Sequence, residues 1–191
     1  MKSDKYPVVA ITGGIGSGKS YVCRLLEQRG IRVYDCDSAA KRLMRGSTLL
    51  KEQLTRLIGP DTYIDGCLNK AAVASFMMQS DANVKKINAI VHPAVAEDFF
   101  QSDYTWMETA ILYDCGFARY ADIVIAVVAP QETRISRIIQ RDSISREKAL
   151  EWIAKQMDQQ EVARRADHVV INDGTQDLLS QIDRILTKIK E

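Results

Sequence analysis

Residues 13–20 read "GGIGSGKS" and follow the apolar run "PVVAIT" at residues 7–12. The octapeptide matches the pattern G-x-x-x-x-G-K-[ST], and it lies between a predicted strand at 8–12 and a predicted helix at 18–29. Glycine lets the backbone wrap around a phosphate with its N–H groups inward, and the N-terminus of the following helix adds partial positive charge. The stretch therefore predicts a phosphate-binding loop (P-loop) for a nucleoside triphosphate.

The dinucleotide fingerprint G-x-G-x-x-G does not fit the same stretch, because its third glycine falls on Lys19 when the first is Gly14. A glycine-rich turn without a ligand is the other alternative, and the strand–loop–helix context disfavours it. In a P-loop, Lys19 is expected to bridge β- and γ-phosphate oxygens, and the Ser20 hydroxyl is expected to bind Mg²⁺. The further residues expected at the ATP phosphates are Gly14, Gly16, Ser17, Gly18 and Tyr21.

The bulk properties are those of an ordinary globular chain. It has 191 residues, a formal net charge of +1 and 46% hydrophobic residues. The balanced charge disfavours binding to nucleic acid by bulk charge, and the longest apolar run, at 123–129, is far shorter than the roughly 20 residues of a membrane-spanning helix. The four cysteines form no Cys-x-x-Cys pair and "MKSDKYP" shows no secretory signal, so we expect a cytoplasmic protein with reduced thiols.

Strands and helices alternate along the chain. The predicted strands are 8–12, 31–34, 104–108, 122–130 and 168–172. The predicted helices are 18–29, 38–45, 48–58, two pieces within 69–101 broken near His92-Pro93, 131–141, 145–164 and a last one from about 175, with a loop at 59–66. This order predicts an α/β fold of three layers, in which a parallel sheet has helices on both faces. The helix-rich part at about 38–101 is an elaboration of a single domain, 1–191.

Two carboxylates follow the second predicted strand. Asp35 and Asp37 are two residues apart, so on an extended backbone their side chains point to the same side. Ligands collect beyond the carboxyl ends of the strands in open α/β sheets, which places both near the transferring phosphoryl group. One is then suited to accept a proton from an attacking hydroxyl and the other to hold the metal through water. The alternative for Asp37 is the N-cap of the helix that follows it.

At these motifs the chain resembles the dephospho-coenzyme A kinase family. The resemblance extends from "ITGGIGSGKS" through "VYDCD", "YIDGCLN", "INAIVHP" and "RDSISREKA" to "ADHVVINDG", and thus covers nearly the whole length. It implies a P-loop kinase that uses ATP and Mg²⁺ to phosphorylate the ribose 3′-hydroxyl of dephospho-coenzyme A, which gives coenzyme A and ADP. It also implies a nucleotide core at about 6–37, 104–130 and 167–191, a helical acceptor-binding region at 38–101 and a helical lid at 131–164.

The resemblance also implies roles for single residues. Asp37 is expected to accept the proton of the 3′-hydroxyl, and Asp35 to support it or the Mg²⁺ shell. Thr12 and His92 are expected on the acceptor side, Arg141 at the ATP phosphates as the lid arginine, and Asn172 near the adenine.

The chain departs from the family pattern at two places. Tyr21 replaces the usual threonine after the P-loop, with little expected effect because that position contributes chiefly its backbone. Residues 108–114 read "ETAILYD" where the family commonly has Asp-Ile-Pro-Leu-Leu-Phe-Glu, which leaves the role of Glu108 open.

Three arginines, Arg134, Arg137 and Arg141, are spaced i, i+3, i+7 and share one face of a predicted helix. With the resemblance, Arg137 and Arg141 are expected to bind ATP, and Arg134 has no assignment. The alternative is a solvated basic face paired with Glu132 and Asp142.

Two other functions remain as rivals. One is a P-loop kinase for another nucleotide or small metabolite, which only the acceptor distinguishes. The other is a nucleotide-binding switch, and the Asn-Lys-x-Asp tetrapeptide with which GTPases read guanine does not occur.

Overall fold

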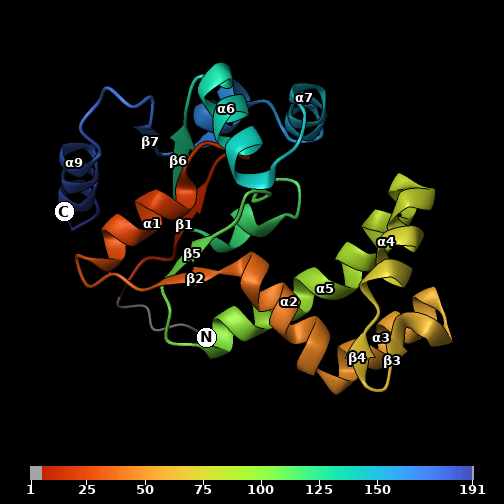
Figure 1. The fold of residues 1–191 in the computed structure, drawn as a ribbon. Coiled ribbons are helices and arrows are strands. Elements are labelled where there is room, and N and C mark those ends of the chain that lie inside the picture. Colours follow the sequence, from red (N-terminus) through yellow and green to blue (C-terminus); the bar gives the residue numbers. More distant parts are fainter. Residues whose placement is uncertain (1–5, 191) are drawn as a thin grey trace. The chain divides into compact units, whose positions relative to one another are not determined.

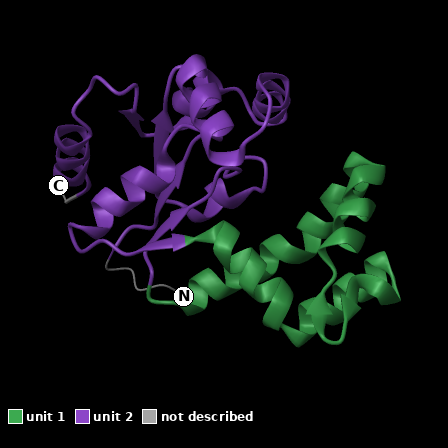
Figure 2. Ribbon diagram, viewed as in Figure 1, with its two compact units in different colours: residues 1–2, 35–103 green, residues 3–34, 104–191 purple. Residues whose placement is uncertain are grey.

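The structure is a computed structural model that describes residues 6–190; residues 1–5 and 191 of the predicted domain, including most of "MKSDKYP", lie outside the described residues. The chain divides into two compact units (Figure 2). Residues 6–34 and 104–190 form the sheet unit, and Asp35–Asp103 form the helical unit.

The five-stranded sheet has the order β2-β5-β1-β6-β7 (Figure 1). Its strands are β1 Val9–Thr12, β2 Val33–Asp35, β5 Trp106–Glu108, β6 Ile123–Val128 and β7 His168–Ile171. β1 pairs in parallel with β5 and β6, and β6 pairs in parallel with β7. β1 is buried throughout and apolar up to Thr12, and most of β6 is apolar and buried, as expected of strands covered on both faces. The predicted parallel α/β sheet is confirmed.

Helices cover both faces of this sheet. The helices of the sheet unit are α1 Lys19–Glu27, α6 Gln131–Asp142, α7 Arg146–Ala154, α8 Gln159–Arg165 and α9 Leu178–Lys190. On one face, Leu26 of α1 and Ile182 of α9 pack with Ile11 in one apolar cluster. On the other face, Ala10 and Ala126 are also fully buried, and α8 packs against β6.

Two glutamine side chains complete backbone hydrogen bonding at strand ends. At β7, the last strand in the sheet order, the Ile171 N–H donates to Gln181 Oε1 (2.8 Å) and Gln181 Nε2 donates to the Ile171 carbonyl (3.0 Å). Gln159 makes the same pair of bonds with Ala129, which follows β6 (3.1 and 2.9 Å). A primary amide can do this because it carries both a donor and an acceptor.

The helical unit contains α2 Cys36–Gly46, α3 Thr48–Ile58, α4 Lys70–Gln79 and α5 Asp81–Gln101, with a hairpin of β3 Tyr63–Ile64 and β4 Cys67–Leu68. α5 packs against the other three helices, and its buried side chains include Ile87, Val91, Val95 and Phe99. The predicted loop at 59–66 is wrong in part, because it holds a 3-10 helix at Pro60–Thr62 and β3.

The predicted break at His92-Pro93 is wrong. α5 continues through Pro93, and the break lies at Ser80, whose side chain accepts a hydrogen bond from the Asn83 N–H (3.2 Å) as the N-cap of α5. Although an interior proline removes one N–H donor and disfavours a helix, the buried face of α5 continues beyond Pro93 with Val95, Ala96 and Phe99.

The predicted helix at 145–164 is two helices, α7 and α8. Asp158 separates them, since its side chain accepts from the N–H groups of Gln160 (2.8 Å) and Glu161 (3.3 Å) and starts α8. Within residues 6–190, no helix combines the length and the apolar content that crossing a membrane requires.

Candidate active site

The phosphate loop connects the carboxyl end of β1 to α1, as predicted. Gly18 is the N-cap of α1 in a left-handed conformation (φ +92°), and no side chain caps the helix. Gly16 is also left-handed (φ +79°), and a Cβ there would overlap the Arg134 backbone; a Cβ at Gly18 would overlap the Asn172 side-chain nitrogen. Both positions therefore require glycine, and the uncapped N-terminus of α1 is of the kind that binds phosphate.

Side chains from distant parts of the chain bind the carbonyl groups of this loop. Arg134 Nε donates to the Ile15 carbonyl (2.9 Å). Arg137 Nη1 donates to the carbonyls of Gly16 and Ser17 (3.3 Å each). Asn172 Nδ2 donates to the Ser17 carbonyl (2.8 Å). Arg137 and Asn172, which the sequence placed at the nucleotide, thus meet at the loop, and Arg134, which the sequence left unassigned, joins them there.

Ile15 ties the loop to the helices that follow β6. Its N–H donates to Gln156 Oε1 (2.7 Å), and its side chain packs with the buried Ile135, Ile138 and Ala149 of α6 and α7. Arg134 is 5% exposed, and this burial lowers its pKa, an effect that nearby Asp158 opposes. No motif marks Gln156, because one glutamine between two helices has no characteristic spacing.

Lys19 lies beside an acidic side chain. Its Nζ is 3.8 Å from Glu108 Oε1, and their side chains are only 9% and 15% exposed. Glu108 is the last residue of β5 and pairs in register with Ile11 of the neighbouring β1. The residue whose role the sequence left open is therefore the ion-pair partner of the P-loop lysine. Thr12, at the end of β1, is buried.

Ser20 is exposed in the first turn of α1. Among the described residues, no group of three or more His, Cys, Asp or Glu side chains is arranged to hold a metal by itself. Mg²⁺ at a nucleotide is commonly held by one or two protein oxygens together with substrate phosphates and waters. A hydroxyl at this position suits that requirement.

Arg141 lies apart from these contacts. Its Nε and Nη2 donate to Asp142 (3.1 and 2.7 Å), and its side chain is 62% exposed. The predicted arginine face is thus divided: Arg134 and Arg137 are at the loop, while Arg141 makes the solvated pair with Asp142. Tyr21 is exposed as well, with the Arg24 guanidinium 5.6 Å from its ring centre.

In the helical unit, Asp35 is the N-cap of α2. Its carboxylate accepts from both the N–H (2.9 Å) and the hydroxyl (2.6 Å) of Ser38. The interpretation of Asp37 as the N-cap is wrong, because α2 begins at Cys36 and Asp37 lies in its first turn. The extended backbone assumed for both aspartates is confirmed at Asp35, the last residue of β2, and is wrong at Asp37, which is helical.

Asp37 and His92 interact within the helical unit. His92 is half-buried in α5, and burial lowers its pKa, while the negative charge of Asp37 raises it. Two residues that the resemblance assigns to the acceptor are therefore close enough for the charge of one to affect the pKa of the other.

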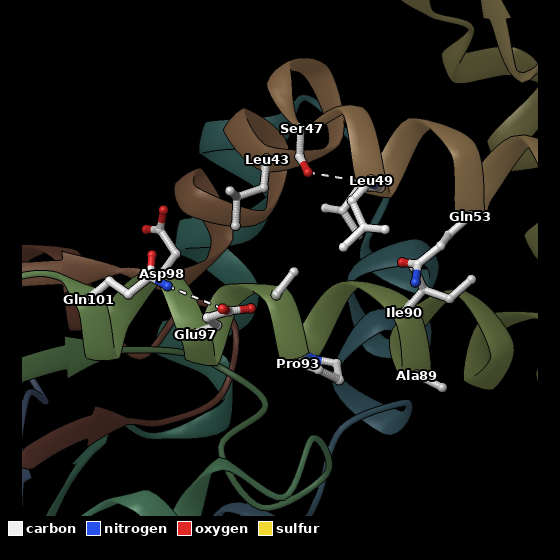
Figure 3. A pocket seen from close by; sticks show the side chains of 12 residues that line it. Leu43, Ser47, Leu49, Gln53, Ala89, Ile90, Pro93, Glu97, Asp98 and Gln101 are labelled. Carbon is white, nitrogen blue, oxygen red and sulfur yellow. Dashed lines mark hydrogen bonds between the residues drawn. The ribbon is translucent and has the colours of Figure 1, made fainter. Parts of the chain in front are cut away.

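The helical unit also contains a groove of about 410 Å³ between α5 and the pair α2 and α3 (Figure 3). One wall includes Leu43, Leu49 and Leu50, and the other includes Ile90, Pro93 and the polar Glu97, Asp98 and Gln101. Arg42 binds Asp98 there (2.6 Å). Sequence reasoning missed the groove, because it arises from the packing of helices far apart in the chain.

Comparisons with known proteins agree on one family. A family model described as dephospho-CoA kinase matches residues 7–177. A curated dephospho-CoA kinase of Porphyromonas gingivalis is 40% identical over 189 residues, which cover 95% of this chain and 94% of that protein.

Solved structures show the same fold. The structure of TT1252 from Thermus thermophilus superposes with a TM-score of 0.80 at 31% identity and covers 96% of this chain and 98% of its own. The dephospho-CoA kinase of Campylobacter jejuni has a TM-score of 0.66 at 18% identity, with 95% and 96% covered, a likeness of fold alone. Together with the parallel sheet, they confirm the predicted α/β kinase fold.

Proposed function

The chain belongs to the dephospho-CoA kinase family, and from this premise we propose that it transfers the γ-phosphate of ATP to the ribose 3′-hydroxyl of dephospho-coenzyme A. The bond between the 3′-oxygen and the γ-phosphorus forms, and the bond from that phosphorus to the β–γ bridging oxygen breaks. The hydroxyl proton leaves, and the products are coenzyme A and ADP. This is the last step of coenzyme A biosynthesis.

The observation that carries the proposal is the phosphate loop at the N-terminus of α1, with its lysine in place. Lys19 is largely buried and paired with Glu108, so its ammonium group is held beside the loop. Such a lysine bridges β- and γ-phosphate oxygens and offsets the charge that develops during transfer.

The transition state of phosphoryl transfer is loose in most accounts, so positioning and charge stabilisation matter more than proton removal. In our proposal Asp37 accepts the proton of the 3′-hydroxyl and the helical unit receives the acceptor. The electrostatic effect of Asp37 on His92, another residue expected at the acceptor, supports this assignment. Arg141 contributes a guanidinium to the ATP phosphates.

We propose that Ser20 and Asp35 hold Mg²⁺, Ser20 directly and Asp35 through water. Both Asp35 oxygens accept bonds from Ser38, and each keeps a further lone pair for such a water. When bound, Mg²⁺ supplies positive charge at the phosphate oxygens. We also propose that the reaction takes place in the cytoplasm, where cysteines are usually kept as reduced thiols.

A coupled assay of ADP release tests the proposal. The protein is given ATP and Mg²⁺ with dephospho-coenzyme A, and in parallel with AMP, dTMP or shikimate. We expect stimulation by dephospho-coenzyme A alone. Stimulation by one of the other acceptors instead would overturn the assignment of the substrate but keep the assignment as a kinase. ADP release that needs no acceptor would favour a nucleotide-binding switch.

A further inference from the structure

Three successive carbonyl groups of the phosphate loop are bound from outside the loop. The Ile15 carbonyl accepts a hydrogen bond from Arg134, and the Gly16 carbonyl accepts one from Arg137. The Ser17 carbonyl accepts hydrogen bonds from both Arg137 and Asn172. The N–H of Gly16 belongs to the same peptide group as the Ile15 carbonyl, and the N–H of Gly18 to the same group as the Ser17 carbonyl. In a planar trans peptide the carbonyl and the N–H point in opposite directions. Holding these carbonyls outward therefore directs the N–H groups of Gly16 and Gly18 to the other side of the loop.

The Ser17 carbonyl is the most firmly held of the three. Ser17 is fully buried and Asn172 is 7% exposed, so water does not compete for the 2.8 Å bond between them. Asn172 follows β7 and is 155 residues from Ser17 in sequence. A buried hydrogen bond between such distant segments forms only when the tertiary structure brings the segments together.

Arg137 fixes the orientation of the Asn172 amide. Its Nη2 donates to both the backbone carbonyl (3.2 Å) and Oδ1 (3.3 Å) of Asn172. With Oδ1 bound to a donor, Nδ2 is the atom that faces the Ser17 carbonyl. Arg137 thus acts on the loop twice, directly through Nη1 and indirectly through Asn172.

We infer that Asn172 and Arg137 are positioning residues that orient the N–H groups of the phosphate loop toward the nucleotide phosphates. The inference rests on the proposed function and deepens it, because it gives Asn172 a role at the phosphates instead of the expected one near the adenine. The two side chains act through the Ser17 peptide group. The adenine plays no part in this role.

A comparison of two ligands tests the inference. Binding of ATP and of inorganic tripolyphosphate, which has no adenine, is measured by calorimetry with the full chain and no acceptor. The variants are Asn172→Ala, Asn172→Asp and Arg137→Ala. Loss of one buried hydrogen bond corresponds to a loss of roughly tenfold in affinity. We expect this loss to be equal for the two ligands.

Asn172→Asp is the sharpest of these variants. The carboxylate keeps the shape of the side chain and its bonds with Arg137, but it replaces the Nδ2 donor with an oxygen that repels the Ser17 carbonyl. We expect it to lose at least as much tripolyphosphate affinity as Asn172→Ala while it keeps more of the melting temperature. Arg164→Ala is the matched control, since Arg164 is an exposed arginine of the same unit that pairs with Glu161, and its affinities should equal those of the wild type.

Each other outcome overturns the inference. A loss for ATP alone would assign Asn172 to the adenine, and a lower melting temperature with unchanged affinities would make the role purely structural. A wild type that does not bind tripolyphosphate would contradict the premise that the loop holds the phosphates. A failure of the proposed acceptor is distinguishable, because it appears in the coupled assay and leaves these affinities unchanged.

Discussion

Lys19 combines a buried stem, a position at the start of α1 and an acidic neighbour 3.8 Å away. If positioning and charge dominate the reaction, the lysine matters more than the proton acceptor. We predict that Lys19→Ala lowers kcat by about 10²–10³-fold, as removal of a group that stabilises developing charge does. Asp37→Asn should lower kcat by less, and the coupled assay measures both.

The control for this comparison is Lys155→Ala, which removes an exposed lysine of the sheet unit that pairs with Glu151. It should keep the wild-type kcat. A Lys19→Ala rate close to wild type, or a larger loss in Asp37→Asn, would contradict the proposed balance of effects.

His92 gives a prediction about pH. Burial lowers its pKa in the folded protein, so below the ordinary value of about 6.5 the unfolded chain binds more protons than the folded one. The free energy of unfolding therefore decreases as the pH falls from about 6.5. We expect His92→Gln to remove this part of the decrease, which urea unfolding at pH 7.5, 6 and 5 measures.

Asp37 offers a check on the same effect, because its negative charge favours protonated His92. Asp37→Asn should therefore make the decrease in stability steeper. Parallel stability curves for the wild type and His92→Gln would show that His92 keeps its ordinary pKa.

The position of Lys19 and Ser20 at the start of α1 was predictable, because the P-loop motif fixes it, while their roles at the phosphates and the metal stay predictions. Arg137 and Asn172 were predicted at the nucleotide, but their hydrogen bonds to the loop carbonyls depend on tertiary placement and have no pattern in the sequence. Gln156 had no signal at all.

At the scale of elements, Asp35 at the start of α2 has two roles that variants can distinguish. Asp35 caps the helix through Ser38, and we also propose that it supports Mg²⁺. Asp35→Ala should lower the free energy of unfolding by about 1 kcal/mol, the usual loss for a missing N-cap. Asp35→Asn keeps an oxygen for the Ser38 N–H and should stay close to wild type, as urea unfolding will show.

The same pair of variants tests whether Asp35 supports the bound Mg²⁺. If Asp35 serves the Mg²⁺ shell, Asp35→Asn requires more Mg²⁺ for half-maximal activity although its stability is unchanged. An unchanged Mg²⁺ requirement would restrict Asp35 to capping.

The observed helix boundaries show that the His92-Pro93 signal was given too much weight. His92-Pro93 suggested a break, but the buried face of α5 continues past it, and the cap at Ser80 sets the boundary. Asp158 marks the boundary between α7 and α8 in the same way. The helix starts coincide with N-cap residues and not with the proline, because an N-cap accepts hydrogen bonds from N–H groups that have no partner within the first turn of a helix.

At the scale of the molecule, the two compact units lead to a prediction about ligand protection. Mg²⁺ with ATP should slow hydrogen exchange in the sheet unit, at the phosphate loop and α6, and dephospho-coenzyme A alone should slow it in the helical unit. At ligand concentrations of 100 times Kd the slowing can reach about 100-fold for amides that exchange through opening of the binding state. Mass spectrometry of peptides from each unit measures it.

Protection of the sheet unit alone by dephospho-coenzyme A would contradict the assignment of the acceptor to the helical unit.

The architecture of the whole chain was predictable because alternating strands and helices admit few arrangements, and the parallel sheet follows from them. The groove of the helical unit was not predictable, since it depends on how α5 lies against α2 and α3.

The bond between Gln181 and Ile171 has a consequence for the protein in a crowded solution. β7 is an edge strand, and its Val169 and Ile171 are 39% and 37% exposed, a combination that invites a strand from another molecule. Gln181 already occupies the backbone donor and acceptor of Ile171. A strand from another molecule must first displace the Gln181 amide before it can pair with Ile171. The Gln181 side chain therefore disfavours aggregation through this edge of the sheet.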